Sequence, residues 1–303
     1  MRVYLLEPYF AGSHRQWAEG YRAHSAHEVH LITHEGQFWK WRLQGGLVTL
    51  AEELREAIDR HGPPDALLGT SMVDLAGLLG LARRDLGGVP TMLYMHENQA
   101  TYPAMGRTRR DPAHVLTNWV AVLAADAVAF NSAYHRDAFF AALPRFLGSF
   151  PDRHHSHLLE GAEAKCTVLP VGIDLRRLDT VPGDRTEPPL VLWNHRWDPD
   201  KAPDLFLDAL AALATAGAGF RVALAGERFV KQDDEHVTAV EALGDRVVAA
   251  SHLPEAEYRE VLARAEAIDP CRPRCEARPS VPPSSEQAER LLDPLERVFK
   301  GMG

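Results

Sequence analysis

Residues 2–33 read RVYLLEPYFAGSHRQWAEGYRAHSAHEVHLIT, and this stretch decides the fold class. It holds two short runs rich in apolar residues, at 2–7 and 27–33, with helical spacing between them at 15–23. Gly12 follows the first run and marks the turn into the helix. A strand, a helix and a second strand in this order predict a βαβ unit, and the apolar runs predict a parallel sheet covered on both faces.

The same alternation continues to about residue 170, which predicts a doubly wound α/β domain. The further strands and helices expected in this domain are strands at residues 66–70, 91–96, 127–131 and 166–170, and helices at residues 48–60 and 73–84.

A second domain is expected after residues 180–189, TVPGDRTEPP, which contain three prolines and one glycine and are typical of an exposed linker. The first domain is then residues 1–179 and the second residues 190–303. Residues 269–285 are too rich in proline, arginine and serine to form a strand, so the second sheet is predicted to be incomplete. We therefore expect two Rossmann-like parallel-sheet domains that face each other across a cleft. The elements expected in the second domain are strands at residues 190–194, 222–226 and 247–250, and helices at residues 202–216, 255–265 and 286–299.

The composition excludes several classes of protein. Hydrophobic residues make up 46% of the 303 residues and charged residues 25%, which argues against disorder, collagen and coiled coil. Three cysteines are too few for a disulfide framework and fit a reducing compartment. We find neither a signal-peptide pattern nor an apolar stretch long enough for a membrane helix. We therefore expect a cytoplasmic chain with no membrane partner, of an oligomeric state that the sequence does not fix.

Charge is unevenly distributed between the two expected domains. Residues 1–180 hold 18 basic and 20 acidic residues, whereas residues 181–303 hold 15 and 22. Twelve of the 15 histidines also lie in the first part. The acidic balance argues against bulk nucleic-acid binding, and a polyanionic partner is expected to contact the first part.

Polar residues follow the first predicted strand, at the edge where open parallel sheets bind ligands. Gly12, Ser13 and His14 open a helix there, so backbone N–H groups can approach an anion. The alternative is a tight turn in which Ser13 is the N-cap of the helix.

A second group of polar residues, HENQ at 96–99, directly follows the buried run TMLYM at 91–95, with Tyr102 close behind. Such side chains have no core to fill at a strand end, which favours a binding site. His96 and Glu97 can transfer protons or bind sugar hydroxyls, and Asn98 extends the same polar run. A zinc-binding HExxH motif is excluded, because residue 100 is not histidine.

Two further strand ends carry candidates. Asn131 and Ser132 lie at the end of the strand at 127–131. They can contact a ligand or serve as the N-cap of the next helix, and the sequence does not decide between these roles. Asn194, Arg196 and Lys201 follow the first strand of the second domain. Arg196 and Lys201 bracket a turn before a helix and are placed to bind a diphosphate, with a solvated turn as the alternative.

No metal or other cofactor is expected. Asp198 and Asp200 lie in a proline turn before a helix, where aspartate is usually a cap. Cys271 and Cys275 lack the spacing and the second pair of a zinc site.

Together these motifs resemble the tRNA-queuosine α-mannosyltransferase family, whose members are retaining GT-B glycosyltransferases that use nucleotide sugars. The resemblance runs from residue 1 to about residue 265, and the motifs are specific as a set. They are residues 7–14 (EPYFAGSH), 39–42 (WKWR), 94–99 (YMHENQ) with Tyr102 and Pro103, 130–132 (FNS), and 193–198 (WNHRWD) with Lys201.

The resemblance implies transfer of mannose from GDP-mannose, the donor substrate, to queuosine at the wobble position of the tRNA-Asp anticodon, with retention of configuration and without a metal. It places His96 and Glu97 at the donor sugar. It also implies that Arg196 and Lys201 neutralise the charge of the leaving diphosphate.

The remaining motif residues divide between donor and acceptor. Donor binding is implied for Gly12, Ser13, His14, Asn98, Asn131, Ser132 and Asn194. Tyr102 is assigned to the acceptor side. Trp39, Trp41 and Arg42 are assigned to the same side, because aromatic and guanidinium planes stack on unpaired bases; two tryptophans buried as anchors of a loop are the alternative.

One departure from the family concerns a Glu-rich motif that contacts the donor in such enzymes. Residues 267–273 read AIDPCRP in its place, and Glu276 and Glu286 do not restore the spacing. The departure leaves open an enzyme with impaired activity and a tRNA- or nucleotide-sugar-binding protein without turnover. A glycosyltransferase acting on a lipid or small-molecule acceptor is a further alternative.

Overall fold

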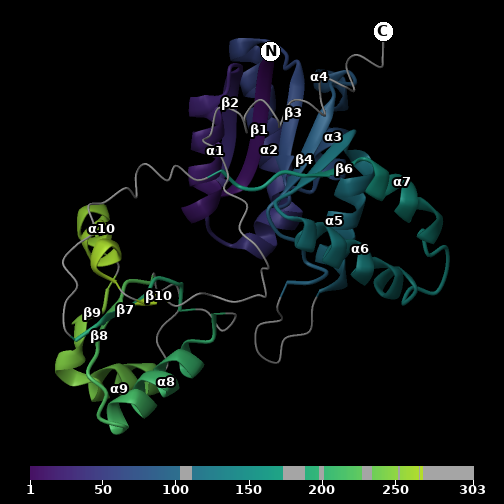
Figure 1. The fold of residues 1–303 in the computed structure, drawn as a ribbon. Coiled ribbons are helices and arrows are strands. Elements are labelled where there is room, and N and C mark those ends of the chain that lie inside the picture. The colour runs from purple at the N-terminus through teal and green to yellow at the C-terminus, as the bar shows by residue number, and fades with distance from the viewer. Residues whose placement is uncertain are drawn as a thin grey trace. The chain divides into compact units, whose positions relative to one another are not determined.

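The computed structural model of the chain describes residues 1–102, 111–172, 188–197, 201–226, 234–251, 253–265 and 267–268 (Figure 1). These residues form two units, one that ends at residue 172 and one from residue 188 to 268, and each is described by itself.

The first unit is built on a six-stranded parallel sheet with the order β2-β1-β3-β4-β5-β6 (Figure 1). Because β1 pairs with β2 on one side and with β3 on the other, the strand order reverses at β1. In open sheets of this kind the ligand binds beyond the carboxyl ends of the strands at such a reversal. The strands are β1 (Arg2–Phe10), β2 (Glu28–Glu35), β3 (Ala66–Thr70), β4 (Thr91–Met95), β5 (Ala127–Phe130) and β6 (Cys166–Val168).

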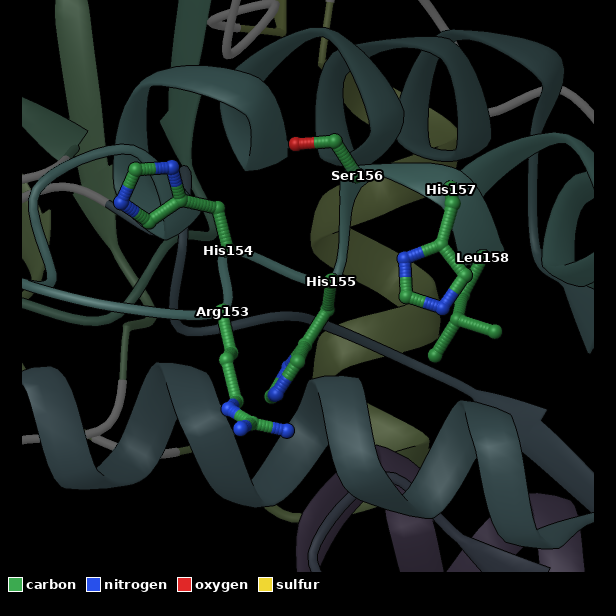
Figure 2. A pocket seen from close by; sticks show the side chains of 6 residues that line it. All are labelled: Arg153, His154, His155, Ser156, His157 and Leu158. Carbon is green, nitrogen blue, oxygen red and sulfur yellow. The ribbon is translucent and has the colours of Figure 1, made fainter.

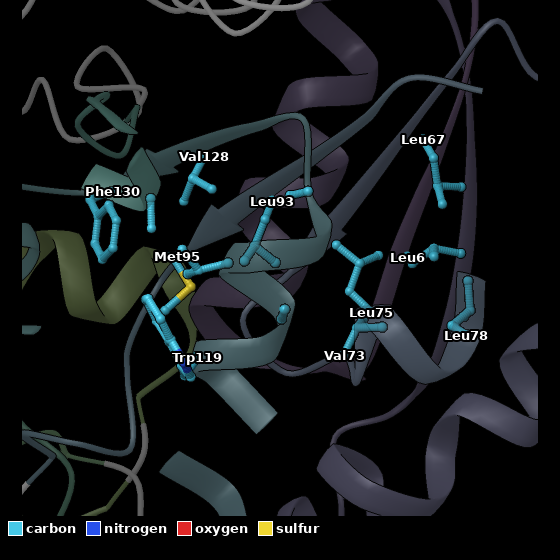
Figure 3. Close-up of a cluster of buried hydrophobic side chains, with 14 of the residues drawn as sticks. Leu6, Leu67, Val73, Leu75, Leu78, Leu93, Met95, Trp119, Val128 and Phe130 are labelled. Atoms are coloured by element: carbon cyan, nitrogen blue, oxygen red, sulfur yellow. The ribbon is translucent and has the colours of Figure 1, made fainter. Parts of the chain in front are cut away.

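Apolar side chains bury both faces of this sheet. Leu6, Leu93 and Trp119 belong to the larger cluster (Figure 3), whereas Leu5 and Trp17 belong to the cluster on the other face, beneath the first helix. Alternate residues of β1 therefore serve opposite faces, which explains why the run is continuously apolar. The helical elements are α1 (Gly12–His24), α2 (Trp39–His61), α3 (Leu75–Leu81), α4 (Arg83–Leu86), α5 (Pro112–Ala124), α6 (Ala133–Leu147), η1 (Ser156–Leu158) and α7 (Leu159–Ala164).

The second unit has a four-stranded parallel sheet with the order β10-β7-β8-β9. Its order reverses at β7, so the loop after β7 lies at the second reversal point of the protein. Trp193 and Leu207 are buried on one face, and Leu192 on the other. The elements are β7 (Leu190–Trp193), α8 (Pro203–Thr215), β8 (Arg221–Leu224), α9 (Asp234–Ala242), η4 (Gly244–Arg246), β9 (Val247–Ala249), α10 (Glu255–Arg264) and β10 (Ala267–Ile268).

Gly226 fixes the loop after β7 against the end of β8. A Cβ atom at this position would lie 1.8 Å from the carbonyl oxygen of His195, closer than any side chain permits. Only glycine allows this approach of two backbone segments.

The expected alternation of strands and helices is confirmed, although several bounds differ and the helices α5 and α6 were not predicted. Two of the differences change the interpretation. Helix α2 begins at Trp39 rather than at residue 48, because Gly45 and Gly46 pack inside the helix instead of breaking it. Strand β10 adds a fourth strand to the second sheet. The predicted linker at 180–189 falls almost entirely outside the described residues, and the predicted helix at 286–299 does so completely.

Within the described ranges, no helix has the length and apolar character required to cross a membrane.

Replacing Leu93 by Ala is expected to lower the free energy of unfolding of the first unit by about 2–5 kcal/mol, because it leaves a cavity at the centre of the sheet. Urea denaturation followed by intrinsic fluorescence measures the change. Leu81→Ala is the control: its side chain is 46% exposed. The control is expected to change stability by less than about 0.5 kcal/mol. Equal losses in the two variants would contradict the assignment of Leu93 to the core.

Candidate active site

Three side chains meet at the carboxyl edge of the first sheet. Glu7 lies in β1, His14 in the first turn of α1, and His96 directly after β4. Each offers one ligating atom, and these atoms lie within 4.8 Å of one another. This Glu7–His14–His96 cluster stands at the strand-order reversal, where the fold class binds ligands.

Glu7 is completely buried, and both of its carboxylate oxygens accept hydrogen bonds. Oε1 accepts from the backbone N–H of Tyr9 at 2.8 Å, and Oε2 is 2.8 Å from Nδ1 of His14. A buried carboxylate is unfavourable unless it is bonded in this way. No role was predicted for Glu7 from the sequence, although an acidic residue inside an apolar strand is a visible signal.

His96 is enclosed by aromatic rings. Its ring centroid lies 4.5 Å from that of His14, 4.6 Å from that of Trp17 and 4.7 Å from that of Tyr94. Burial, assisted by His14 and His135, holds the pKa of His96 well below the ordinary 6.5. Its buried Nε2 atom has no hydrogen-bond partner among the described residues. A neutral imidazole with one unsatisfied nitrogen is suited to bind a ligand hydroxyl.

Asn131 connects His96 to a second buried histidine. Its amide nitrogen donates to the backbone oxygen of His96 at 2.7 Å, and its amide oxygen lies 2.8 Å from Nδ1 of His135. Burial lowers the pKa of His135 to about 4. Ser132 is the N-cap of α6, since its hydroxyl oxygen accepts from the N–H of His135, so the capping interpretation is confirmed. The donor-binding roles of Asn131 and Ser132 stay predictions.

The turn after β1 leaves the start of α1 without a side-chain cap. The N-cap is Ala11, and Ser13 lies inside the first turn, so the expectation that Ser13 caps the helix is wrong. Gly12 has a φ of 48°, which lets the helix start earlier than the polar pattern indicated. Uncapped N–H groups at a helix start favour an anion, and Gly12, Ser13 and His14 stay predicted donor-binding residues.

The loop after His96 is stabilised by Asn98. The amide oxygen of Asn98 accepts from the backbone N–H of Thr101, and its amide nitrogen donates to the Thr101 hydroxyl, both at 2.9 Å. The backbone N–H of Tyr102 donates to the carbonyl of Asn98 at 3.2 Å. Asn98 therefore shapes this loop with both ends of its amide. Glu97 and Tyr102 are half-buried beside it, and their predicted roles are untested by this geometry.

Three of the four predicted acceptor residues, Trp39, Trp41 and Arg42, lie on the first turn of α2 rather than in a loop, whereas Tyr102 lies in the loop after β4. Trp41 is 67% exposed, which contradicts its reading as a buried anchor, while Trp39 is half-buried with its ring 5.4 Å from that of His114. Phe38, which the sequence analysis missed, is 74% exposed at the N-cap. We call Phe38 and Trp41 the aromatic patch. Its signal in the sequence was the run of aromatic residues at 38–41, FWKW.

The ring of Trp41 is seated on a glycine. A Cβ atom at Gly45 would lie 2.6 Å from the ring, so the indole rests directly on the helix. The half-buried Arg42 lies on the inner side, where its charge adds to burial in lowering the pKa of His34. Trp41 is thus a fixed aromatic plane with an open face, whereas the guanidinium of Arg42 is not fully exposed.

In the second unit, the loop after β7 carries the predicted cationic residues. Arg196 and Asn194 are exposed and Lys201 is half-buried just before α8. The amide nitrogen of Asn194 lies 3.3 Å from the hydroxyl of Tyr258. Asp198 and Asp200 are outside the described residues.

The loop Arg153–Leu158 lines a hollow of about 580 Å³ that contains none of the predicted site residues (Figure 2). Figure 2 shows His154, His155 and His157 pointing in different directions. In the part of the chain that the structure describes, the group of three side chains that can converge on a metal ion is the Glu7–His14–His96 cluster.

Residues 2–173 match a family model described as tRNA-queuosine alpha-mannosyltransferase N-terminal. A relative from Drosophila melanogaster, tRNA-queuosine alpha-mannosyltransferase, is 31% identical over 273 residues, which cover 86% of this chain and 70% of the relative.

Solved structures support the fold. Sucrose-phosphate synthase from Thermosynechococcus elongatus aligns with a TM-score of 0.60 and 15% identity, over 88% of this chain and 74% of that chain. The catalytic domain of starch synthase IV from Arabidopsis thaliana, bound to ADP and acarbose, aligns with a TM-score of 0.57 and 13% identity. The alignment covers 88% of this chain and 77% of that chain. The architecture is therefore that of GT-B glycosyltransferases.

Acid is expected to destabilise the first unit through His135. Between the ordinary pKa of 6.5 and about 4, the unfolded chain binds a proton that the folded chain excludes, so stability falls as the pH is lowered through this window. His135→Gln is expected to reduce that fall by up to about 3 kcal/mol. Urea denaturation between these two pH values measures it, with the exposed His24→Gln as control. An unchanged pH dependence in His135→Gln would contradict the expectation.

Proposed function

Because this chain belongs to the tRNA-queuosine alpha-mannosyltransferase family, we propose that it transfers mannose from GDP-mannose to queuosine at the wobble position of tRNA-Asp, with retention of configuration. The observation that carries the proposal is the family match over residues 2–173, the range that includes the Glu7–His14–His96 cluster.

The geometry at the strand ends supports a sugar-binding site. His96 is neutral, and its Nε2 atom is buried with no hydrogen-bond partner among the described residues. A buried nitrogen of this kind is satisfied by one hydroxyl of a bound sugar. Asn131 holds the backbone of His96 through its carbonyl and so keeps the ring in place.

Two features support binding of the donor diphosphate. Helix α1 starts without a side-chain cap, so its first N–H groups and its positive end favour negative charge. Arg196 and Lys201 lie after β7, at the strand-order reversal of the second sheet. Their charges stabilise the diphosphate as the bond to the sugar breaks, when negative charge increases on the leaving oxygen.

The aromatic patch supports an RNA acceptor. Phe38 and Trp41 are exposed at the start of α2, and unpaired bases stack on such rings. Gly36, just before the patch, packs against Ala11 at the start of α1, with a Cβ-to-Cβ separation that would be 2.2 Å. The chain two residues before the patch therefore packs against the uncapped turn of α1.

The decisive experiment is incubation of the purified chain with GDP-mannose and queuosine-containing tRNA-Asp, followed by mass spectrometry of the digested nucleosides. A hexose added to queuosine is the expected result. If the folded protein binds this tRNA but adds no hexose, the proposed transfer is wrong and the chain is a binding protein without turnover. Transfer to a lipid or a small molecule instead would identify another acceptor.

Replacing His96 or Arg196 by Ala is expected to lower the rate of transfer by about 10²–10³-fold, the usual loss for one electrostatic contact to the transition state. The same mass-spectrometric assay measures the rate, and thermal unfolding checks that the variants fold. The exposed His24→Ala is the matched control and is expected to keep wild-type activity. Wild-type activity in the His96→Ala variant would contradict the predicted role of His96 in transfer.

Replacing Trp41 by Ala is expected to weaken tRNA binding by about 1–3 kcal/mol, the range for one stacked base. Gly45→Ala is expected to weaken it as well, because a Cβ atom there displaces the indole ring. Fluorescence anisotropy with labelled tRNA at fixed salt measures the affinity. Val48→Ala is the control, on the same helix and 52% exposed. Equal affinities for Trp41→Ala and the control would contradict a role of Trp41 in binding tRNA.

A further inference from the structure

Arg42 is a half-buried cation that has no partner in the part of the chain that the structure describes. It donates no hydrogen bond and forms no ion pair there, and its Nε atom is completely enclosed. Arg55, a half-buried arginine on the same helix, donates from Nε to Asp85 at 3.1 Å and from Nη2 to the carbonyl oxygen of Leu81 at 2.8 Å. A guanidinium removed from water is unfavourable without such acceptors, so Arg42 lacks an acceptor that its position requires.

The side chains around Arg42 do not supply this acceptor. A Cβ atom at Gly46, one turn further along α2, would lie 3.9 Å from Cβ of Arg42 and 3.7 Å from Nδ1 of His34. The side chain of Arg42 therefore starts on the side of α2 that faces the end of β2. The carboxylate of Glu53 lies 3.3 Å from Nε2 of His34 and makes no ion pair with Arg42. Because Nε is the enclosed nitrogen, Nη1 and Nη2 are the donors of Arg42 that can reach a ligand.

Trp41 presents an aromatic plane on the neighbouring side of the same helical turn. Successive residues of an α-helix are rotated by about 100°, so the exposed ring of Trp41 and the inner guanidinium of Arg42 leave the helix in different directions. The two side chains match the two chemically different parts of a nucleotide, a flat base and an anionic phosphate. The half-buried position of Arg42 suits hydrogen bonds from its terminal nitrogens better than stacking of its plane on a second base.

We propose that Arg42 binds a phosphate of the RNA backbone through Nη1 and Nη2, beside the nucleotide whose base stacks on Trp41. The inference rests on the proposed function and adds a phosphate contact to its acceptor side. Arginine binds phosphate through two parallel hydrogen bonds, and such contacts fix the position of a nucleic acid without reading its sequence. The donor diphosphate is the other phosphate in the proposed reaction, but its proposed partners are the start of α1 and the loop after β7.

The test measures the affinity of the full chain for queuosine-containing tRNA-Asp by fluorescence anisotropy, as a function of salt concentration. Each phosphate contact to a single strand contributes about 0.7 to the slope of log affinity against log salt. Arg42→Gln is expected to weaken binding by about 10–100-fold and to reduce the magnitude of this slope by about 0.7. Arg42→Lys keeps the charge, so it is expected to keep the slope but to bind more weakly. Trp41→Ala, which removes no charge, is expected to weaken binding with an unchanged slope.

Arg60→Gln is the charge-matched control. Arg60 is exposed near the other end of α2, about 27 Å along the helix axis from Arg42. This separation exceeds the Debye length of about 8 Å at physiological salt, so Arg60→Gln is expected to leave the slope nearly unchanged. Thermal unfolding checks folding: Arg42→Gln is expected to unfold at the wild-type temperature or above it, because the substitution removes an unpaired charge.

A second measurement locates the contact on the RNA. Anticodon stem-loop RNAs are prepared with one uncharged methylphosphonate linkage at successive positions of the loop. At one linkage the wild-type chain is expected to lose affinity, whereas Arg42→Gln is expected to lose none. Equal losses for the wild-type chain and Arg42→Gln at every linkage would overturn the contact.

The outcomes separate the inference from the proposed function. If folded Arg42→Gln keeps the wild-type slope, or if Arg60→Gln reduces the slope equally, the role of Arg42 is overturned whether or not the chain transfers hexose. If Arg42→Gln weakens binding of GDP and leaves tRNA binding unchanged, Arg42 belongs to the donor site and the inference is overturned. If the slope depends on Arg42 but the wild-type chain transfers no hexose, the inference stands and the proposed transfer fails. If the wild-type chain does not bind this tRNA, both are overturned.

Discussion

The rest of this structure depends on one constraint: a parallel sheet buried on both faces has no room for polar side chains except at the ends of its strands. β1, β3, β4 and β5 are buried along most of their length, and apolar clusters cover both faces of the first sheet. Since all six strands run in the same direction, their carboxyl ends share one edge. Polar residues distant in sequence, such as Glu7, His96 and Asn131, therefore meet there without any special loop design.

Within that edge, the environment of each histidine decides its chemistry. His14 touches a buried carboxylate, whereas His96 touches aromatic rings and His135 touches an amide. Burial is the largest cause that lowers the pKa of both His96 and His135. Residues of the same type, a few ångströms apart, thus have different bonding partners because of what surrounds them.

Predictions from the sequence were most accurate where a short apolar run corresponds to a fully buried strand. The strand at 66–70 was predicted with the bounds that β3 has, because Ala66, Leu67 and Leu68 form an apolar run between Asp65 and Ser71. His96 and Asn131 were found because polar residues at buried strand ends stand out. Tertiary packing could not be inferred from the sequence. The helix was predicted to begin at residue 48, yet Gly45 and Gly46 lie inside α2, where Gly45 packs against the ring of Trp41 and Gly46 lies beside Pro8 and His34. The alternative in which Ser13 is the N-cap was wrong, because the positive φ of Gly12 was not predictable from the sequence. No role was predicted for Glu7, because its bonding partner, His14, lies seven residues later in α1.

The contact between Gly36 and Ala11 joins two loops that the sequence treats as separate. Because a methyl group at Gly36 would overlap the Cβ atom of Ala11, the loop after β2 and the turn after β1 fit together without spare space. Displacement of one loop must be accommodated by the other, since packed backbone has few alternative arrangements. Gly36 lies two residues before the aromatic patch and Ala11 is the N-cap of α1, so a larger side chain at Gly36 would require the turn at Ala11 to move. Evolutionary change in this region is therefore expected as paired substitutions at positions 11 and 36.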